Sequence, residues 1–366
     1  MNDLSKTPVG ILGIGLYLPE EVRRNDWWPE HIVDSWREGR QAKNLARAER
    51  EHADPLTDGA RQTFSGMADW ADDPFKGAVE RRVMPAGMKP SDMEVAAAED
   101  ALARAGVKRE EIDLLFVFSQ VPDQLIISNA TRVHERLGLP RNCFSMSTDS
   151  ACNAFVQQMT LAEQMIRGGR ARYALLVQSA AVGHLCRPED PHSAWMGDAA
   201  TAVVVGPVSE GRGILGTSHK TDGSFHDALI VGSPGKLWYQ AKGEPLYLYT
   251  PDRDAARRML MAIADLAKDG VEDALKDAGL RHDDVDFYAT HQSTRWFRQV
   301  TQAHIGIHRA RTFDSFAWTG SLAACNIPFM LGMGEREGLL AAGHVAALHT
   351  GGSGITWSGM VIRWGR

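Results

Sequence analysis

One of the four cysteines, Cys152, lies where a short strand-like segment turns into a helix. Residues 144–146 are typical of a strand, and residues 156–166 carry apolar side chains at helical spacing. The unpaired N–H groups and the positive dipole end of that helix would favour a thiolate over a thiol. A thiolate is the nucleophile of covalent acyl transfer, so Cys152 is a candidate nucleophile; the alternative is a small buried core cysteine.

A histidine, His291, directly follows residues 287–290, which the sequence predicts to be a central strand. Ligand sites in open α/β sheets lie at the carboxyl ends of such strands. An imidazole there could give or take a proton beside Cys152. The chain has 13 histidines, most of which we expect on the surface, and a surface position is the alternative for His291 as well.

An internal repeat indicates how the chain is organised. Residues 99–113 return as residues 272–286 without a gap, at an offset of 173 that carries Glu99 onto Glu272. The same offset places the Ala-Cys-Asn triplet at 151–153 on the triplet at 324–326. We therefore predict two similar α/β halves, residues 1–210 and 211–366, in which buried strands alternate with helices.

A segment at about residues 25–85 interrupts this pattern. It is rich in charged residues and in tryptophan, and residues 29–50 are typical of a helix. We expect a helical cap laid over the core, with its tryptophans buried against the core or against a partner chain.

Composition excludes several classes of protein. The net charge of −6, without a Lys/Arg-rich run, disfavours nucleic-acid binding. The four cysteines form no CxxC pair, which disfavours a disulfide framework and a zinc site and fits a reducing cytoplasm. No apolar run is long enough for a membrane span, and the N-terminus lacks the profile of a signal peptide. We therefore expect a cytoplasmic enzyme without a metal and without a membrane partner.

Several motifs, in this order, resemble the ketoacyl-acyl carrier protein synthase III group of the thiolase-fold superfamily. They are GIGLYLP at 13–19, DSACNAF at 149–155, GDAATAVV at 197–204, THQ at 290–292 and GGSGITWSG at 351–359. Each motif alone is weak, and the ordered set is specific. The resemblance covers most of the chain outside the segment at 25–85.

This resemblance implies a thiolase-like fold in which two duplicated halves form a layered αβαβα sandwich. Cys152 would accept an acyl group from coenzyme A or an acyl carrier protein, with no permanently bound cofactor. His291 would assist acylation and then polarise the thioester carbonyl of the second substrate. The backbone N–H groups of Cys152 and Ser353 would form the oxyanion hole. The protein would be a homodimer in which Ile126 and Ile127 reach the wall of the partner's acyl pocket.

Two positions depart from the family pattern. The family has an asparagine seven residues before a proline; here Pro328 places that position on Ser321, and Asn326 stands five residues further on. Ser321 would then be the third catalytic residue, with a single short donor to the enolate that loss of CO₂ creates. Asp190-Pro191 stands where the family has an Asp-Arg pair, so the usual contacts to coenzyme A are in question.

The predicted function is acyl transfer through a Cys152 thioester, with Claisen-type carbon–carbon condensation in polyketide or specialised metabolite biosynthesis as its leading form. Transfer to an alcohol or amine is the first alternative, because it needs no enolate. A non-catalytic partner subunit is the second alternative, and the intact motifs around Cys152 and His291 argue against it.

Overall fold

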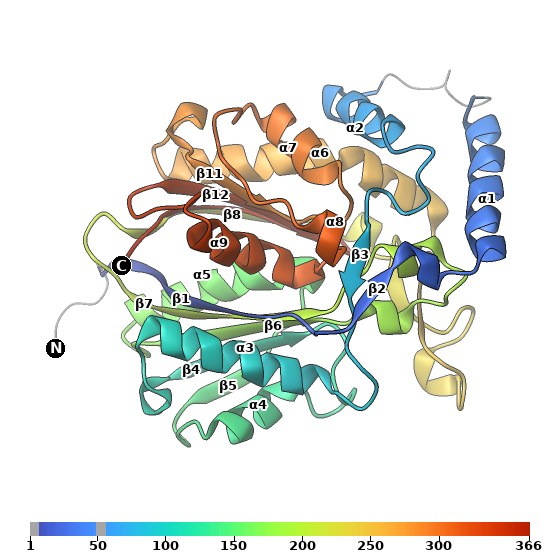
Figure 1. Cartoon of the computed structure of the whole chain (residues 1–366). Helices are drawn as coiled ribbons and strands as arrows, with labels where there is room; N and C mark the ends of the chain where they lie inside the picture. Colours follow the sequence, from blue (N-terminus) through green and yellow to red (C-terminus); the bar gives the residue numbers. More distant parts are fainter. Residues whose placement is uncertain (1–6, 49–55) are drawn as a thin grey trace.

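Two β-sheets lie one above the other in the computed structural model, which describes residues 7–48 and 56–366, without the side chains of 40–48 (Figure 1). The five-stranded sheet has the order β1 (Val9–Tyr17), β7 (Ala199–Pro207), β6 (Ala174–Ala180), β4 (Leu114–Ser119) and β5 (Phe144–Ser147). The four-stranded sheet has the order β11 (Phe287–Thr290), β12 (Val345–Gly352), β13 (Thr356–Arg363) and β8 (Gly213–Thr221). The strands of the first sheet thus precede those of the second in the chain.

Helices form the other three layers of the molecule. The outer face of the first sheet is covered by α3 (Pro90–Ala105) and α4 (Asn129–Leu137). Between the sheets lie α5 (Ala154–Arg167) and α9 (Asn326–Arg336). The outer face of the second sheet carries α6 (Arg253–Asp277) and α7 (Phe297–Ile305), and α8 (Phe316–Thr319) is a short turn before α9. The predicted αβαβα sandwich is confirmed.

The central strands are mostly apolar because helices cover them on both sides. In β4 and β6 the residues up to Phe118 and Ala180 are all buried, and alternate side chains belong to different hydrophobic clusters. Close approach of α3 to β1 requires glycine in the strand. A Cβ added to Gly15 would lie 1.9 Å from the carbonyl oxygen of Ala97, so no larger residue fits there.

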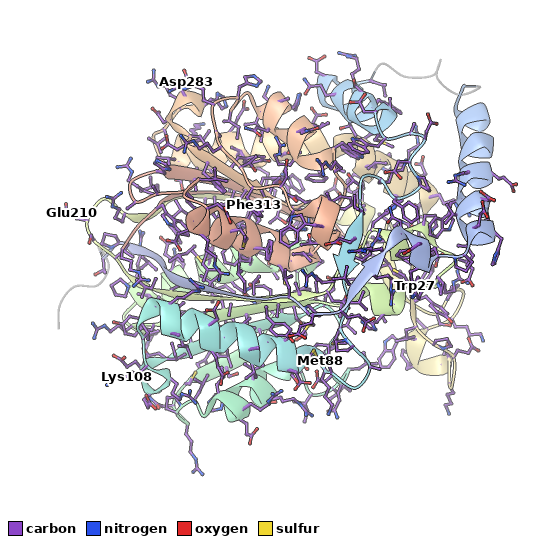
Figure 2. All side chains as sticks on the ribbon, in the orientation of Figure 1. Trp27, Met88, Lys108, Glu210, Asp283 and Phe313 are labelled. Carbon is purple, nitrogen blue, oxygen red and sulfur yellow. The ribbon has the colours of Figure 1, made fainter. Side chains whose placement is uncertain are left out.

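The segment at 25–85 holds two helices, α1 (Glu30–Ala48) and α2 (Asp58–Ala68), followed by the strand β3 (Glu80–Arg82). This strand pairs with β2 (Val22–Arg24), which directly precedes the segment. Trp28 and Trp36 are buried in a cluster with Phe75 and Ala194, whereas Trp27, labelled in Figure 2, is 47% exposed. Structural packing therefore accounts for Trp28 and Trp36 and not for Trp27.

A smaller excursion between β8 and α6 carries the two-stranded sheet of β9 (Ile230–Gly232) and β10 (Tyr247–Tyr249). None of the helices in the described ranges combines the length and hydropathy that crossing a bilayer requires.

The predicted offset of 173 between the halves holds for residues 99–113, but at the turn around Cys152 it is wrong by one residue. Glu111 N–H donates to the Lys108 carbonyl and Asp284 N–H donates to the Arg281 carbonyl, each at 3.0 Å, so donor and acceptor both follow the offset of 173. The turns before α5 and α9 instead match at 172, because the positive φ angles fall on Ala151 (50°) and Ala323 (47°). Asn153 and not Cys152 is therefore the structural counterpart of Cys325. A sequence match of three residues could not detect this shift.

Candidate active site

Cys152 is the middle residue of a single 3₁₀ turn, η4 (Ala151–Asn153), that leads directly into α5. The turn closes with a hydrogen bond of 3.0 Å from the Asn153 N–H to the Ser150 carbonyl, and it places Ala151 at a φ of 50°. A positive φ is unusual for a residue with a side chain and marks a strained, sharply bent turn. The turn sets Cys152, the candidate nucleophile, at the start of a helix.

The loop between β12 and β13 is fastened to this turn. Thr350 Oγ1 donates to the Cys152 carbonyl at 2.9 Å, and Asn153 Nδ2 donates to Thr356 Oγ1 at 3.1 Å. Gly352 touches the turn so closely that a Cβ added to it would lie 2.3 Å from the Ser150 carbonyl oxygen. The glycine-rich motif therefore forms one wall of the site.

The prediction that the helix end lowers the pKa of Cys152 was wrong. Burial raises the pKa of this thiol to about 12. Its side chain packs against a buried apolar cluster that includes Leu322 and Ala323, and desolvation disfavours the charged form. The helix end is present, but in this surrounding it does not outweigh the loss of water, so the resting group is a thiol.

His291 follows β11 at its carboxyl end, where the sequence placed it. Its backbone N–H donates to the His349 carbonyl at 3.2 Å, and its ring stands edge-on to Phe297 with centroids 5.6 Å apart. Burial lowers the pKa of His291 to about 4, against a smaller opposing effect of a backbone hydrogen bond with Ala323. The imidazole is therefore neutral throughout the physiological pH range.

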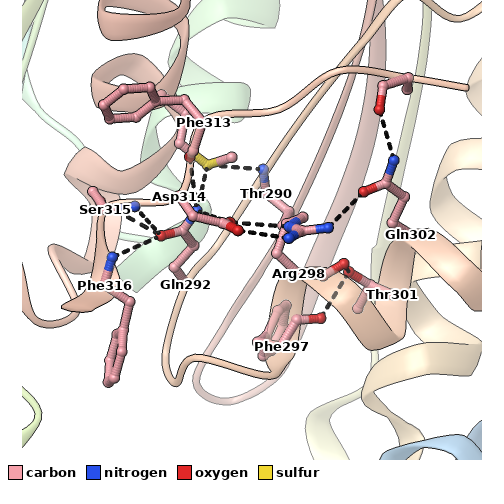
Figure 3. A network of polar contacts seen from close by, with 12 residues as sticks. Thr290, Gln292, Phe297, Arg298, Thr301, Gln302, Phe313, Asp314, Ser315 and Phe316 are labelled. Atoms are coloured by element: carbon pink, nitrogen blue, oxygen red, sulfur yellow. Dashed lines mark hydrogen bonds and ion pairs between the residues drawn. The ribbon is translucent and has the colours of Figure 1, made fainter. Parts of the chain in front are cut away.

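The next residue, Gln292, anchors His291 through a buried carboxamide (Figure 3). Its amide nitrogen, Nε2, donates to the Phe313 carbonyl at 3.0 Å. Its Oε1 accepts from the backbone N–H groups of Ser315 at 3.1 Å and Phe316 at 3.2 Å. Donor and acceptor are both satisfied, so the backbone of His291 is held between β11 and the start of α8.

The sequence did not identify Asn326 as a site residue, yet the structure brings it to His291. Asn326 begins α9, is 1% exposed, and places Nδ2 2.9 Å from His291 Nδ1. Its Oδ1 accepts the Leu322 N–H at 3.2 Å. The only sequence signal was an asparagine in the Ala-Ala-Cys-Asn run, and its distance from the family's position concealed its proximity to His291.

Ser321 lies on the same loop and is held through its backbone. Its N–H donates to the Trp195 carbonyl at 2.7 Å, and its carbonyl accepts the Gly197 N–H at 3.0 Å. Within the described part of the chain, its hydroxyl group makes no hydrogen bond to His291 or to Cys152. A catalytic role for Ser321 stays a prediction.

Ser353 is exposed and directly follows Gly352 at the end of β12, one residue from the contact with the cysteine turn. This position is compatible with an oxyanion donor, which stays a prediction. Ile126 and Ile127 are 82% and 66% exposed and precede α4. Among the residues that the structure describes, no cluster of His, Cys, Asp or Glu could hold a metal ion.

Sequence comparison adds the following likenesses. The family model described as "3-Oxoacyl-[acyl-carrier-protein (ACP)] synthase III" matches residues 146–223. The model of the C-terminal part of the same family matches residues 275–364. Beta-ketoacyl-[acyl-carrier-protein] synthase III of Rhodospirillum centenum is 30% identical over 294 residues, which are 79% of this chain and 88% of that protein. Beta-ketoacyl-[acyl-carrier-protein] synthase III 1 of Bacillus anthracis is 28% identical over 359 residues, 98% of this chain and 99% of that protein.

Solved structures share the fold. The 3-oxoacyl-(acyl carrier protein) synthase III, FabH, of Pseudomonas aeruginosa superposes with a TM-score of 0.76 at 23% identity, covering 98% of this chain and 99% of that one. OleA of Xanthomonas campestris superposes with a TM-score of 0.75 at 20% identity, with complete coverage of both chains.

Proposed function

Because the chain belongs to the beta-ketoacyl-[acyl-carrier-protein] synthase III family and is thus an acyltransferase, we propose that it condenses an acyl group carried on Cys152 with a second thioester. The acyl donor is an acyl-coenzyme A or an acyl carrier protein, and the product belongs to polyketide or specialised metabolite biosynthesis. The observation that carries the proposal is the convergence of three segments on one site. Thr350 and Gly352 of β12 contact the Cys152 turn, and the His291 N–H at the end of β11 donates to the His349 carbonyl of β12.

Loading begins with attack of the Cys152 sulfur on the thioester carbonyl of the donor. A bond forms between this sulfur and the acyl carbon, the bond between that carbon and the donor sulfur breaks, and the thiol proton ends on the released donor thiol. The backbone N–H groups of Cys152 and Ser353 stabilise the oxyanion. The raised pKa of the Cys152 thiol makes departure of its proton a substantial part of the barrier to loading.

Condensation with a malonyl-type acceptor releases CO₂ and leaves an enolate on the thioester. The enolate carbon attacks the acyl carbon on Cys152, the bond to sulfur breaks, and the released thiolate takes up a proton from water. A neutral His291 can stabilise the enolate oxygen only as a hydrogen-bond donor, since burial keeps its pKa low. Ser321 would supply the second donor.

Ser321 favours one alternative function. A hydroxyl offers one donor where a carboxamide offers two, and loss of one charge-assisted hydrogen bond costs about 1.5–3 kcal/mol. That is roughly a tenfold to hundredfold lower rate of decarboxylation. Acyl transfer to an alcohol or amine escapes this cost, because it forms no enolate.

Two measurements test the proposal. Intact-protein mass spectrometry after incubation with panels of acyl-coenzyme A and acyl carrier protein donors should show one acyl group, absent from Cys152→Ala. The acylated enzyme should then release CO₂ from malonyl or methylmalonyl donors, and Ser321→Asn should preserve or raise that release. Acylation without any CO₂ from either donor on either carrier would overturn decarboxylative condensation and leave the transfer alternative.

A homodimer is part of the proposal and rests on exposed apolar groups at one edge. The strand β5 is the last strand of its sheet, and Phe144 at its start is half exposed. Unpaired edge strands bind further strands, and Ile126 and Ile127 present apolar side chains that a partner could cover. Light scattering at micromolar concentration should give twice the chain mass of 40.2 kDa. A monomer would remove the partner pocket assigned to these isoleucines.

A further inference from the structure

One pair of equivalent positions is apolar in the first half of the molecule and polar in the second half. At the offset of 173 for the strands and 172 for the turns, His291 and Asn326 correspond to Phe118 and Ala154. Phe118 and Ala154 form one buried apolar cluster with Ala324. In the second half the equivalent pair is polar and meets at 2.9 Å between Asn326 Nδ2 and His291 Nδ1.

The carboxamide of Asn326 is not needed to build its turn. The first half makes the same turn, with a positive φ at Ala151, although an alanine stands at the corresponding position 154. The buried amide of Asn326 therefore stabilises something that the first half lacks, and the group it faces there is His291.

The orientation of this amide is determined by its neighbours. Oδ1 of Asn326 accepts the Leu322 N–H at 3.2 Å, so the NH₂ group must point the other way, toward His291. A carboxamide NH₂ group can only donate. The ring nitrogen that it faces, Nδ1, must then be the unprotonated acceptor, and the single proton of the neutral ring is on Nε2.

We propose that Asn326 is a positioning residue that holds His291 in the tautomer with a proton on Nε2, so that the ring presents a donor and not a base to the reacting thioester. The inference rests on the proposed function for its catalytic consequence, but not for the tautomer itself. It also assigns a role to the asparagine that the family pattern did not place. With Asn326 acting through His291, a donor remains in the site although Ser321 replaces the family's asparagine.

The test measures the ring nitrogens of His291 by ¹⁵N NMR in the wild type, Asn326→Ala and Asn326→Asp. The resonances are assigned by their loss in His291→Ala. We expect an unprotonated Nδ1 in the wild type and a mixture of tautomers in Asn326→Ala. Asn326→Asp keeps the shape and the acceptor for the Leu322 N–H, but it turns the donor into an acceptor, so Nδ1 should become protonated. A protonated Nδ1 in the wild type, or no change in either variant, would overturn the inference.

Single-turnover transfer from the pre-acylated enzyme provides the second readout. Asn326→Ala should slow transfer at least about tenfold, whereas alkylation of Cys152 should change less than about twofold. In a His291→Ala background the same substitution should have no further effect on transfer, because Asn326 acts through the ring. An equal loss in both backgrounds would mean a merely structural role and would refute the inference. If the wild type transfers no acyl group at all, the proposed function fails and the tautomer is still decided by NMR.

Discussion

The reactivity of Cys152 should rise with pH across the whole neutral range. Burial raises its pKa to about 12, so at pH 7 only about one molecule in 10⁵ holds a thiolate, and at pH 9 about one in 10³. Each pH unit should therefore increase the rate of alkylation about tenfold. A thiolate stabilised by the helix end alone, with a pKa near 7, would give a rate that levels off above about pH 8.

The assay is alkylation by iodoacetamide between pH 6 and 9, followed by mass spectrometry of the peptide that contains Cys152. Cys152→Ala gives the background from the other cysteines, of which Cys143 and Cys325 are buried. His291→Ala should retain the slope, because desolvation and not pairing with the imidazole raises the thiol pKa. A plateau below pH 8 in the wild type would refute the argument, and a plateau that disappears in His291→Ala would point to a thiolate–imidazolium pair.

Two further predictions concern Gly352 and the buried histidines. Gly352→Ala should reduce loading of Cys152 by at least about tenfold, because the added Cβ would lie 2.3 Å from the Ser150 carbonyl oxygen. Gly351→Ala is the control, because its added Cβ would come no closer than 3.7 Å to another atom. Equal loading of the two variants would contradict the contact at Gly352. Burial lowers the pKa of His291 to about 4 and that of His349 to about 3, so the unfolded chain binds protons first as the pH falls below about 6.5. Each ring should therefore lower the free energy of unfolding by up to about 2 kcal/mol as the pH falls from 7 to 5. In urea titrations, His349→Asn should make the free energy of unfolding less dependent on pH. An unchanged slope in that variant would show that His349 is not buried in the neutral form.

Local patterns were sufficient to find the residues whose position depends on the chain nearby. Cys152 stands between a strand and a helix, and His291 ends an apolar run, so periodicity alone placed both at the ends of buried elements. The layered fold followed from the repeat at 99–113 and 272–286, which holds in the backbone. The positions of Cys152 and His291 and the layered fold depend on the spacing of residues along the chain, which can be read from the sequence.

Features that depend on surroundings escaped this reasoning. The pKa of Cys152 depends on the apolar side chains brought around it from a loop about 170 residues away, and the sequence gives only the helix that follows. Asn326 is 35 residues from His291 along the chain, and only the packing of α9 against β11 brings them together. The offset between the turns changed by one residue in a stretch where alanines made every register plausible.

The duplicated architecture separates two tasks that a condensing site must combine. The turn before α5 presents a sulfur, and its counterpart before α9 presents Ala324 at the same place, so in the proposed mechanism the thioester forms on the first half. The end of β11 presents the His291 ring, and its counterpart at the end of β4 presents Phe118, so in the proposed mechanism only the second half offers an imidazole donor to the enolate oxygen. The apolar pair Phe118 and Ala154 supports the cysteine turn by packing. In the proposal above, the polar pair His291 and Asn326 determines which ring nitrogen of His291 carries the proton. A substitution that made the second pair apolar again should therefore leave the fold and the thiol in place and remove the donor.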